Sequence, residues 1–159
     1  MNYSILCIGS LKERYWKEAE QEYRKRIRRF GSWNVTELPE YPLPEHPSEK
    51  EIARALPKEG EALKHKISPQ SFSIALCVEG ERCSSEELAA LIARISREGK
   101  SSITLLIGSS YGLSPDLKAA CQKRLSISPM TFPHQMMRII LAEQFYRAHK
   151  IIAGERYHK

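Results

Sequence analysis

The sequence predicts an α/β fold in one domain spanning residues 1–159, with a mostly parallel sheet and helices on both faces. Three observations lead to this fold class. Strand-like and helix-like segments alternate along the chain, as parallel strands joined by crossover helices require. Residues 72–80 and 102–108 are nearly continuous in apolar side chains, which is typical of strands buried on both faces, and we expect the first to be central. No internal repeat or low-complexity tract interrupts the alternation.

The first half of the chain contains two predicted strands and two predicted helices. The first helix has apolar and aromatic residues at three-to-four-residue spacing, the pattern of a helix that buries one face. Residues 38–48 hold four prolines and are expected to form an extended surface loop. We expect Pro57 to break or restart the second helix. The four elements are expected at residues 3–9, 12–30, 33–38 and 48–66.

The second half continues the alternation with clear helix-terminus signals. Ser84 and Glu87 have the spacing of a capping box, and Gly99 is placed to end that helix. Ser114 is placed to cap a short helix with Pro115 at its first position. The elements are expected at residues 72–80, 84–99, 102–108, from 115, at 124–128, and from 133 to about 152.

Three loops of this predicted sheet are candidates for a ligand site. They follow the strand at 72–80, the strand at 102–108, where the sequence reads GSSYG, and the last strand, where it reads SPMTFPH. In open parallel sheets, ligands bind outside the carboxyl ends of the strands. The glycine loop matches neither GxxxxGK[ST] nor GxGxxG, so neither phosphate-binding motif is present. We therefore expect one ligand to contact all three loops.

The charge of the chain favours an acidic partner, nucleic acid first. The formal net charge is +6. One concentration is RKRIRR at residues 24–29, which has five basic residues in six, and another runs from Cys121 to the end, with seven Lys or Arg against two Glu. A run of this kind is also the ordinary solvated face of a helix, so both interpretations stay open.

Composition favours a cytoplasmic protein without a metal. No apolar run approaches the ~20 residues of a membrane span, and the N-terminal stretch has no secretory pattern, so we expect no membrane association. The four cysteines form no CxxC pair and are expected to be reduced thiols. The five histidines are scattered, so we expect no metal site.

The predicted last helix is apolar around more than one face. Met136, Ile139, Leu141 and Phe145 point in different directions on a helical wheel. Such a helix is either buried deep within a monomer or packed on both its own sheet and a second chain. We favour a homodimer, because a chain of this size offers few other elements to cover it.

Four stretches resemble the small SPOUT-class methyltransferases that modify a pseudouridine of bacterial large-subunit ribosomal RNA, the methyltransferase H family. The similarity spans the whole chain and is most specific in its last third. The matching stretches are EYRKRI, IGSSYGLSP, SISPMTFPHQMMRIILAEQFYRA and the terminal YHK.

The resemblance implies a fold, a cofactor and a target. The α/β fold would contain a C-terminal trefoil knot, one of the rare exceptions to unknotted chains. The protein would be a homodimer with its active site at the subunit interface, and S-adenosylmethionine would bind bent inside the knot. The target would be N3 of a pseudouridine in helix 69 of 23S ribosomal RNA in the assembled 70S ribosome. The implied cofactor residues are Leu76, Gly108, Ile127, Ser128, Pro129, Met130, Thr131 and Phe132.

The resemblance and the chemistry together suggest catalytic residues. The N3 proton must leave before or during methyl transfer, and a histidine has a suitable pKa, so His158 is the first candidate. Tyr157 would stack on a base. Arg147 would hold a phosphate or the target base, although it also has the i,i+4 spacing of an ordinary surface pair with Glu143.

Further residues are candidates for RNA contact, and one position departs from the family pattern. His134, at the start of the last helix, either packs there or touches the substrate. Ser109 stands where the family usually has a second glycine, which puts the geometry of the loop in question. The candidate RNA-binding residues are Arg138, His134, Lys159, Arg24, Lys25 and Arg28.

Two other functions remain open at the level of sequence. One is a SPOUT methyltransferase that acts on transfer RNA or another ribosomal site, against which the MTFPHQMMR and YHK matches argue. The other is a non-catalytic ribosome-binding or assembly factor that retains the fold, which Ser109 favours. A Rossmann-type methyltransferase fits poorly, because its glycine loop should follow the first strand.

Overall fold

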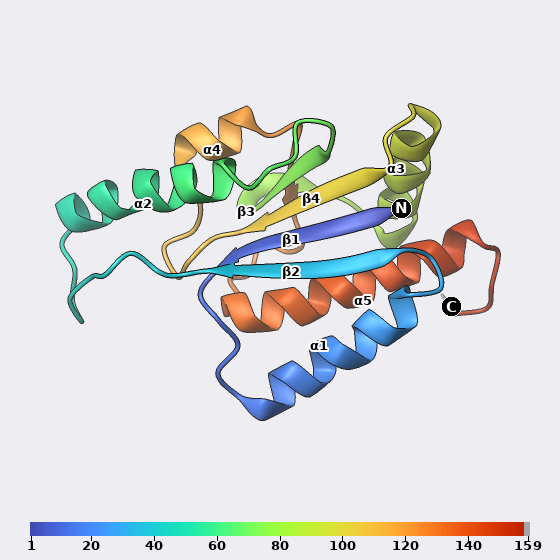
Figure 1. Cartoon of the computed structure of the whole chain (residues 1–159), viewed down its shortest axis with the longest axis horizontal. Helices are drawn as coiled ribbons and strands as arrows, with labels where there is room; N and C mark the ends of the chain where they lie inside the picture. The colour runs from blue at the N-terminus through green and yellow to red at the C-terminus, as the bar shows by residue number, and fades with distance from the viewer. Residues whose placement is uncertain (158–159) are drawn as a thin grey trace.

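The computed structural model describes residues 1–157 and contains one five-stranded sheet (Figure 1). The strand order is β2-β1-β4-β3-β5, and every neighbouring pair is parallel. The predicted α/β fold with a parallel sheet is thereby confirmed. The middle strand is β4, and β3, which contains residues 72–80, is an interior strand between β4 and β5. The strands are β1 (Asn2–Ile8), β2 (Ser32–Leu38), β3 (Phe72–Arg82), β4 (Ser102–Ile107) and β5 (Lys123–Ser126).

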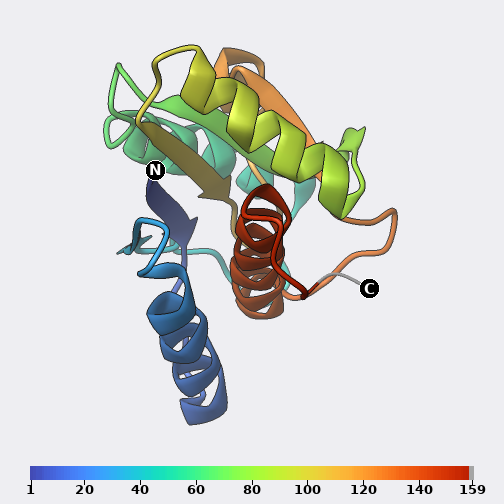
Figure 2. The same ribbon diagram turned by 90° about the vertical axis from the view of Figure 1, so that its right-hand side faces the viewer.

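Helices cover both faces of the sheet, as Figures 1 and 2 show. On one face, α5 packs between α1 and α3; on the other, α2 packs beside α4. Alternate side chains of β1 enter the two cores: Tyr3 and Ile5 face α5, whereas Leu6 and Ile8 face α2 and α4. The helices are α1 (Arg14–Ile27), α2 (Glu49–Lys64), α3 (Ser85–Arg97), α4 (Pro115–Ala120) and α5 (His134–Ile152).

The helix termini follow the predicted capping chemistry. Ser84 and Glu87 form the expected capping box, and the Ser114 hydroxyl accepts the amide N–H of Leu117 with Pro115 at the helix start. The first helix ends at Ile27, three residues earlier than expected, because residues 28–30 turn toward β2.

The predicted break at Pro57 is wrong, because α2 is continuous through this residue. A proline inside a helix removes one N–H donor, here the one that would bond the carbonyl of Ala53. Both residues are exposed, so water can satisfy that carbonyl. On the buried side, Gly60 lets α2 approach α4: a β-carbon there would lie 3.1 Å from the Ser114 β-carbon.

A polar pair lies inside the core beneath α5. The Tyr3 hydroxyl and Nε2 of His149 share a hydrogen bond at 2.6 Å. The ring of Phe30 stacks on this imidazole, with centroids 4.9 Å apart. Burial lowers the pKa of His149 to about 4, so the pair is a neutral structural contact at physiological pH.

Strand β3 contains an irregularity that shapes the site. Its Leu76 and its Glu81 both pair with Leu125 of β5, so the residues between them leave the ladder as a long bulge. Gly80 closes this bulge against β5, where a β-carbon would lie 2.8 Å from the backbone nitrogen of Leu125. Only glycine fits this crossing without a shift of the strand.

Candidate functional site

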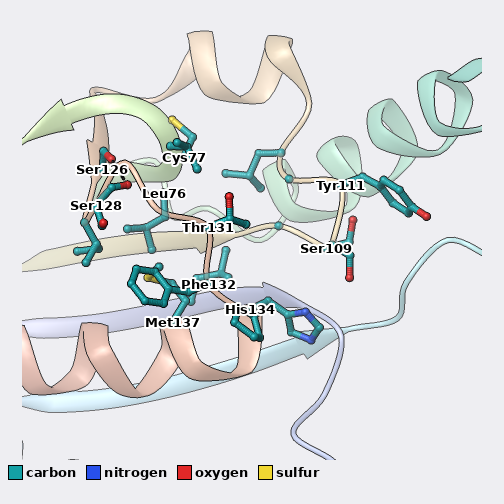
Figure 3. A pocket seen from close by; sticks show the side chains of 18 of the residues that line it. Leu76, Cys77, Ser109, Tyr111, Ser126, Ser128, Thr131, Phe132, His134 and Met137 are labelled. Atoms are coloured by element: carbon teal, nitrogen blue, oxygen red, sulfur yellow. Dashed lines mark hydrogen bonds between the residues drawn. The ribbon is translucent and has the colours of Figure 1, made fainter.

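A cavity of about 720 Å³ opens at the carboxyl ends of β3, β4 and β5 (Figure 3). Its walls come from the β3 bulge, the loop after β4, and the segment between β5 and α5, which are the three loops expected from the sequence. This volume is typical of a small-molecule site. The lining residues are 76–79, 107–113, 118, 125–128, 130–135 and 137.

Seven of the eight predicted cofactor residues line this cavity, and one does not. Pro129 is exposed and outside the lining. Figure 3 shows Leu76 and Thr131 facing each other across the middle of the cavity, with Phe132 on the side of α5. The seven lining residues are Leu76, Gly108, Ile127, Ser128, Met130, Thr131 and Phe132.

The loop after β4 folds back sharply on Gly108. The Gly112 amide donates to the Ser109 carbonyl at 2.9 Å. A β-carbon on Gly108 would overlap the Gly112 carbonyl and lie 2.8 Å from the Leu113 nitrogen, so no larger residue fits. Gly112 supplies the left-handed backbone of the turn, with φ +85°.

Ser109 fits this loop without strain. No residue other than glycine has a positive φ in the described chain, so this position does not require a glycine conformation. The Ser109 hydroxyl donates to Oε2 of Glu59 at 2.9 Å, and Oε1 of the same carboxylate accepts the Tyr41 amide at 2.8 Å. Glu59, buried on α2, therefore ties the glycine loop to the proline-rich segment.

The β3 bulge adds lining residues that sequence reasoning missed. Cys77, Val78 and Glu79 leave the ladder with β5 and line the cavity. The nearly continuous apolar run at residues 72–80 predicts a regular strand, and the isolated Gly80 within it is the one sequence sign of a bulge. Glu79 forms an ion pair with Lys118 of α4, and this hydrogen bond lowers the pKa of the carboxyl.

The rim of the cavity is apolar and exposed. Among the described residues, five large apolar side chains are exposed, and three of them, Val78, Tyr111 and Met130, line this cavity with exposed fractions of 50%, 45% and 69%. Sequence reasoning missed Val78 and Tyr111 as site residues. An exposed apolar rim with a few polar groups is a common form of ligand site.

His134 lies at the edge of the same cavity, at the start of α5. A β-carbon on Gly9 would lie 3.2 Å from His134 Nε2 and 2.7 Å from Oε1 of Glu40. The imidazole and this carboxylate therefore flank the same glycine, at the end of β1. Figure 3 shows the His134 ring directed toward the side of Ser109.

Arg138 is buried and held by two carboxylates. Its side chain is 3% exposed. Its Nε donates to Glu20 of α1 at 2.9 Å, and Nη1 donates to Glu37 of β2 at 2.6 Å. This placement gives Arg138 a packing role that joins α5 to α1 and β2, and its contact with RNA stays a prediction.

Arg147 and Tyr157 lie together, away from the cavity. The Arg147 guanidinium donates to Oε1 of Glu143 at 2.6 Å and lies 4.8 Å from the centroid of the Tyr157 ring. At 1.5 Å per residue, Arg147 is about 20 Å along α5 from the cavity-lining His134. One chain does not bring these predicted catalytic residues to its own cavity. The remaining two terminal candidates, His158 and Lys159, lie outside the described residues.

The other RNA candidates are exposed and do not line the first cavity; they are Arg24 and Lys25 of α1 and Arg28, the C-cap residue of that helix. Together with residues at the start of β2, they line a second, smaller cavity.

Residues 1–157 contain no group of three or more His, Cys, Asp or Glu side chains that could hold a metal ion. The four cysteines are free, and burial raises the pKa of Cys77 at the cavity above its ordinary value. None of the helices described is long and apolar enough to cross a bilayer.

Comparison with known proteins now identifies the family. Residues 1–158 match the family described as "Predicted SPOUT methyltransferase", and the chain belongs to this family. The resemblance drawn from the sequence is therefore confirmed. The chain is 47% identical to the ribosomal RNA large subunit methyltransferase H of Clostridium novyi (strain NT) and 45% identical to that of Bacillus pumilus (strain SAFR-032), each over 100% of both chains.

Solved structures share the fold at low sequence identity. A probable methyltransferase from Bordetella pertussis Tohama I aligns with a TM-score of 0.56 and 16% identity, over 92% of this chain and 93% of that one. A probable methylase family protein from Haemophilus influenzae Rd KW20 aligns with a TM-score of 0.55 and 13% identity, over 99% of this chain and 70% of that one. These likenesses concern the fold alone.

Proposed function

We propose that this protein transfers a methyl group from S-adenosylmethionine to N3 of a pseudouridine in helix 69 of 23S ribosomal RNA, in the assembled ribosome. The observation that carries the proposal is one cavity lined by the three segments to which the family resemblance assigns the cofactor. Relatives named ribosomal RNA large subunit methyltransferase H, 45% and 47% identical over their full length, support ribosomal RNA as the substrate class.

The cavity suits a ligand that carries no phosphate. Among its described lining residues, Lys118 is the only lysine or arginine, and its ammonium is paired with Glu79. A phosphorylated nucleotide would lack a free cation here. S-adenosylmethionine combines an adenosine with an amino acid and a sulfonium, so it fits an apolar cavity with few charges.

The chain's own residues would hold this cofactor in two ways. Backbone N–H and C=O groups of the loops at 108–113 and 127–132 would bond the adenine edge, while Leu76 and Ile127 would cover its faces. When bound, the cofactor supplies an electrophilic methyl group for in-line transfer. Fixing the methyl and the nucleophile in line is the main task of the protein.

The N3 proton of the target needs an acceptor. His158 remains our first candidate because of its pKa range and its place in the YHK end. His134 lines the cavity, and we assign it to contact with the target base. We assign Tyr157 to stacking on a base and Lys159 to RNA contact.

The distance between the cavity and Arg147 supports a homodimer. From His134 to Ile151, every residue of α5 is buried or half-buried, yet Met136 and Ile140 lie on the side opposite its buried core residues. A two-fold axis across the side of α5 that carries Met136 and Ile140 would set Arg147 and Tyr157 of one copy beside the cavity of the other. We propose that the active site is built this way, and that the C-terminal segment forms a trefoil knot around the cofactor.

Transfer of radiolabelled methyl from S-adenosylmethionine tests the proposal. Ribosomes that lack the modification, separated large subunits and free 23S RNA are assayed in parallel, and labelled RNA is mapped with nucleases. We expect label only at the helix 69 pseudouridine and only in whole ribosomes. Absence of label from every substrate, with folded protein present, would leave a non-catalytic ribosome-binding factor; label in transfer RNA would show a different target.

Mixed dimers test the shared site. Gly108→Ala in one copy and Tyr157→Ala in the other each inactivate a homodimer in this proposal. Refolding the two variants together should restore activity, because one of the two sites in a mixed dimer is intact. Two inactive variants that stay inactive when mixed would contradict the shared site.

This protein acts on ribosomes, so we also place it in the cytoplasm.

A further inference from the structure

A second cavity of about 380 Å³ lies between α1 and β2, the edge strand of the sheet. It is lined by Arg24, Lys25 and Arg28 from the last turns of α1, and by Asn34 from β2. The three cations follow the spacing i, i+1 and i+4, so two of them are neighbours on one helix face. This cavity is hereafter the basic groove.

Among the described residues, the cations of the basic groove have no ion-pair or hydrogen-bond partner, whereas their neighbours do. Arg26 is paired with Glu22 at 2.9 Å, and Arg29 is paired with Glu155. Within residues 1–157, the side chains of Arg24, Lys25 and Arg28 form no ion pair or hydrogen bond. The glutamates of α1 are engaged elsewhere, Glu18 with Arg14, Glu20 with Arg138 and Glu22 with Arg26, so this helix does not neutralise the three groove cations.

The groove is separate from the cofactor cavity. It lies at the amino-terminal half of β2, near Asn34, whereas the cofactor cavity opens at the carboxyl ends of the strands. Asn34 is level with Thr104 of β4, three residues before Ile107, where the lining of the cofactor cavity begins, so about 10 Å of strand separates the two levels. A molecule that reaches both sites must be extended on that scale.

We propose that the basic groove binds the phosphate backbone of RNA and docks the substrate at a second point, away from the target base. This inference rests on the proposed function only for the identity of the RNA. Two arginines offer planar forks that match phosphate oxygens, and Lys25 adds a point charge. The amides of Gln21 and Asn34 at the groove can bond ribose 2′-hydroxyls.

The salt dependence of RNA binding tests this docking site without any methyl transfer. Binding of the full chain to protein-free 23S RNA is measured against KCl concentration, with no cofactor, for the wild type and for R24Q/K25Q/R28Q. Loss of three phosphate contacts in this variant should flatten the slope of log K against log[KCl] by about 2. Between about 50 and about 200 mM KCl, wild-type affinity should fall about 20-fold more than that of the variant.

A matched variant, R14Q/R26Q/R29Q, removes three paired cations at and just beyond the same helix, with the same change in net charge. Its slope should stay close to that of the wild type. An equal flattening of the slope in both variants would overturn the proposed docking site, because it would show that RNA binding depends only on net charge. If the triple groove variant does not fold, Arg28→Gln alone should flatten the slope by about 0.7.

Other outcomes name other partners. If R24Q/K25Q/R28Q loses affinity for intact ribosomes but not for protein-free RNA, the groove binds a ribosomal protein, and RNA docking is overturned. Displacement of RNA by inorganic phosphate, at matched ionic strength, would make it a site for a single anion. A wild type that fails to methylate, yet binds RNA with the predicted slopes, would refute the proposed function and keep the groove.

Discussion

Substituting Gly108 with alanine tests how closely the cavity depends on its glycine loop. The added β-carbon would overlap the Gly112 carbonyl and lie 2.8 Å from the Leu113 nitrogen. Carbon atoms at ordinary van der Waals contact are about 3.5–4.0 Å apart, so the loop must open by about 1 Å. Both obstructing groups belong to the backbone, and neither can rotate away as a side chain would.

The expected effect is a loss of cofactor affinity with little loss of fold. A displacement of about 1 Å in a positioning group can cost about a hundredfold, which is about 2.8 kcal/mol of binding free energy. Isothermal titration calorimetry with S-adenosylmethionine measures this loss directly, and thermal unfolding verifies the fold.

The matched control is Ser110→Ala in the same loop, which adds no atom and should bind as the wild type does. Gly99→Ala, at the end of α3, measures the general cost of replacing a left-handed glycine, because nothing lies within 4 Å of its β-carbon. Unchanged affinity in Gly108→Ala would refute the assignment of this loop to the cofactor.

Three further substitutions test contacts outside the loop. His149 has a pKa of about 4 in the folded protein and its usual 6.5 in the unfolded chain. The neutral imidazole therefore contributes its full stabilisation of the fold above pH 6.5, and this stabilisation is lost as the pH falls toward about 4. Compared with His149→Leu in urea titrations, the wild type should lose about 3 kcal/mol more stability across that window; parallel profiles would contradict this. Arg138→Met should lower the free energy of unfolding by about 3 kcal/mol because it leaves two carboxylates uncompensated, and should leave the salt slope of RNA binding unchanged; a flatter slope with full stability would indicate an RNA contact. Ser109→Ala should cost about 2 kcal/mol in urea unfolding, since it removes a donor from the buried Glu59 carboxylate, and a loss well below that would show that the contact is dispensable.

Local chemistry made most of the fold predictable. Ser84 with Glu87, and Ser114 with Pro115, marked helix starts because capping depends on a few adjacent residues. The apolar runs marked buried strands. Placing the three loops together then needed only the rule that parallel strands end at the same edge of a sheet.

Features that depend on distant contacts were not predictable in this way. The partners of Arg138, which are Glu20 and Glu37, lie 118 and 101 residues away in sequence, so its burial had no local sign. Pro57 is tolerated within α2 because it faces water, which only the packing decides. The β3 bulge depends on the close approach of Gly80 to the backbone of β5, a distant contact, so the sequence did not predict that the bulge lines the cavity.

A crystal structure of the protein with S-adenosylhomocysteine, the product of the proposed reaction, tests the central claim most directly. We predict the ligand in the cavity between the β3 bulge, the Gly108 loop and residues 127–132. The adenine should contact backbone groups of these loops, and Arg147 of a second copy should lie at the mouth. Ligand bound elsewhere on the chain, or none at saturating concentration, would contradict the account.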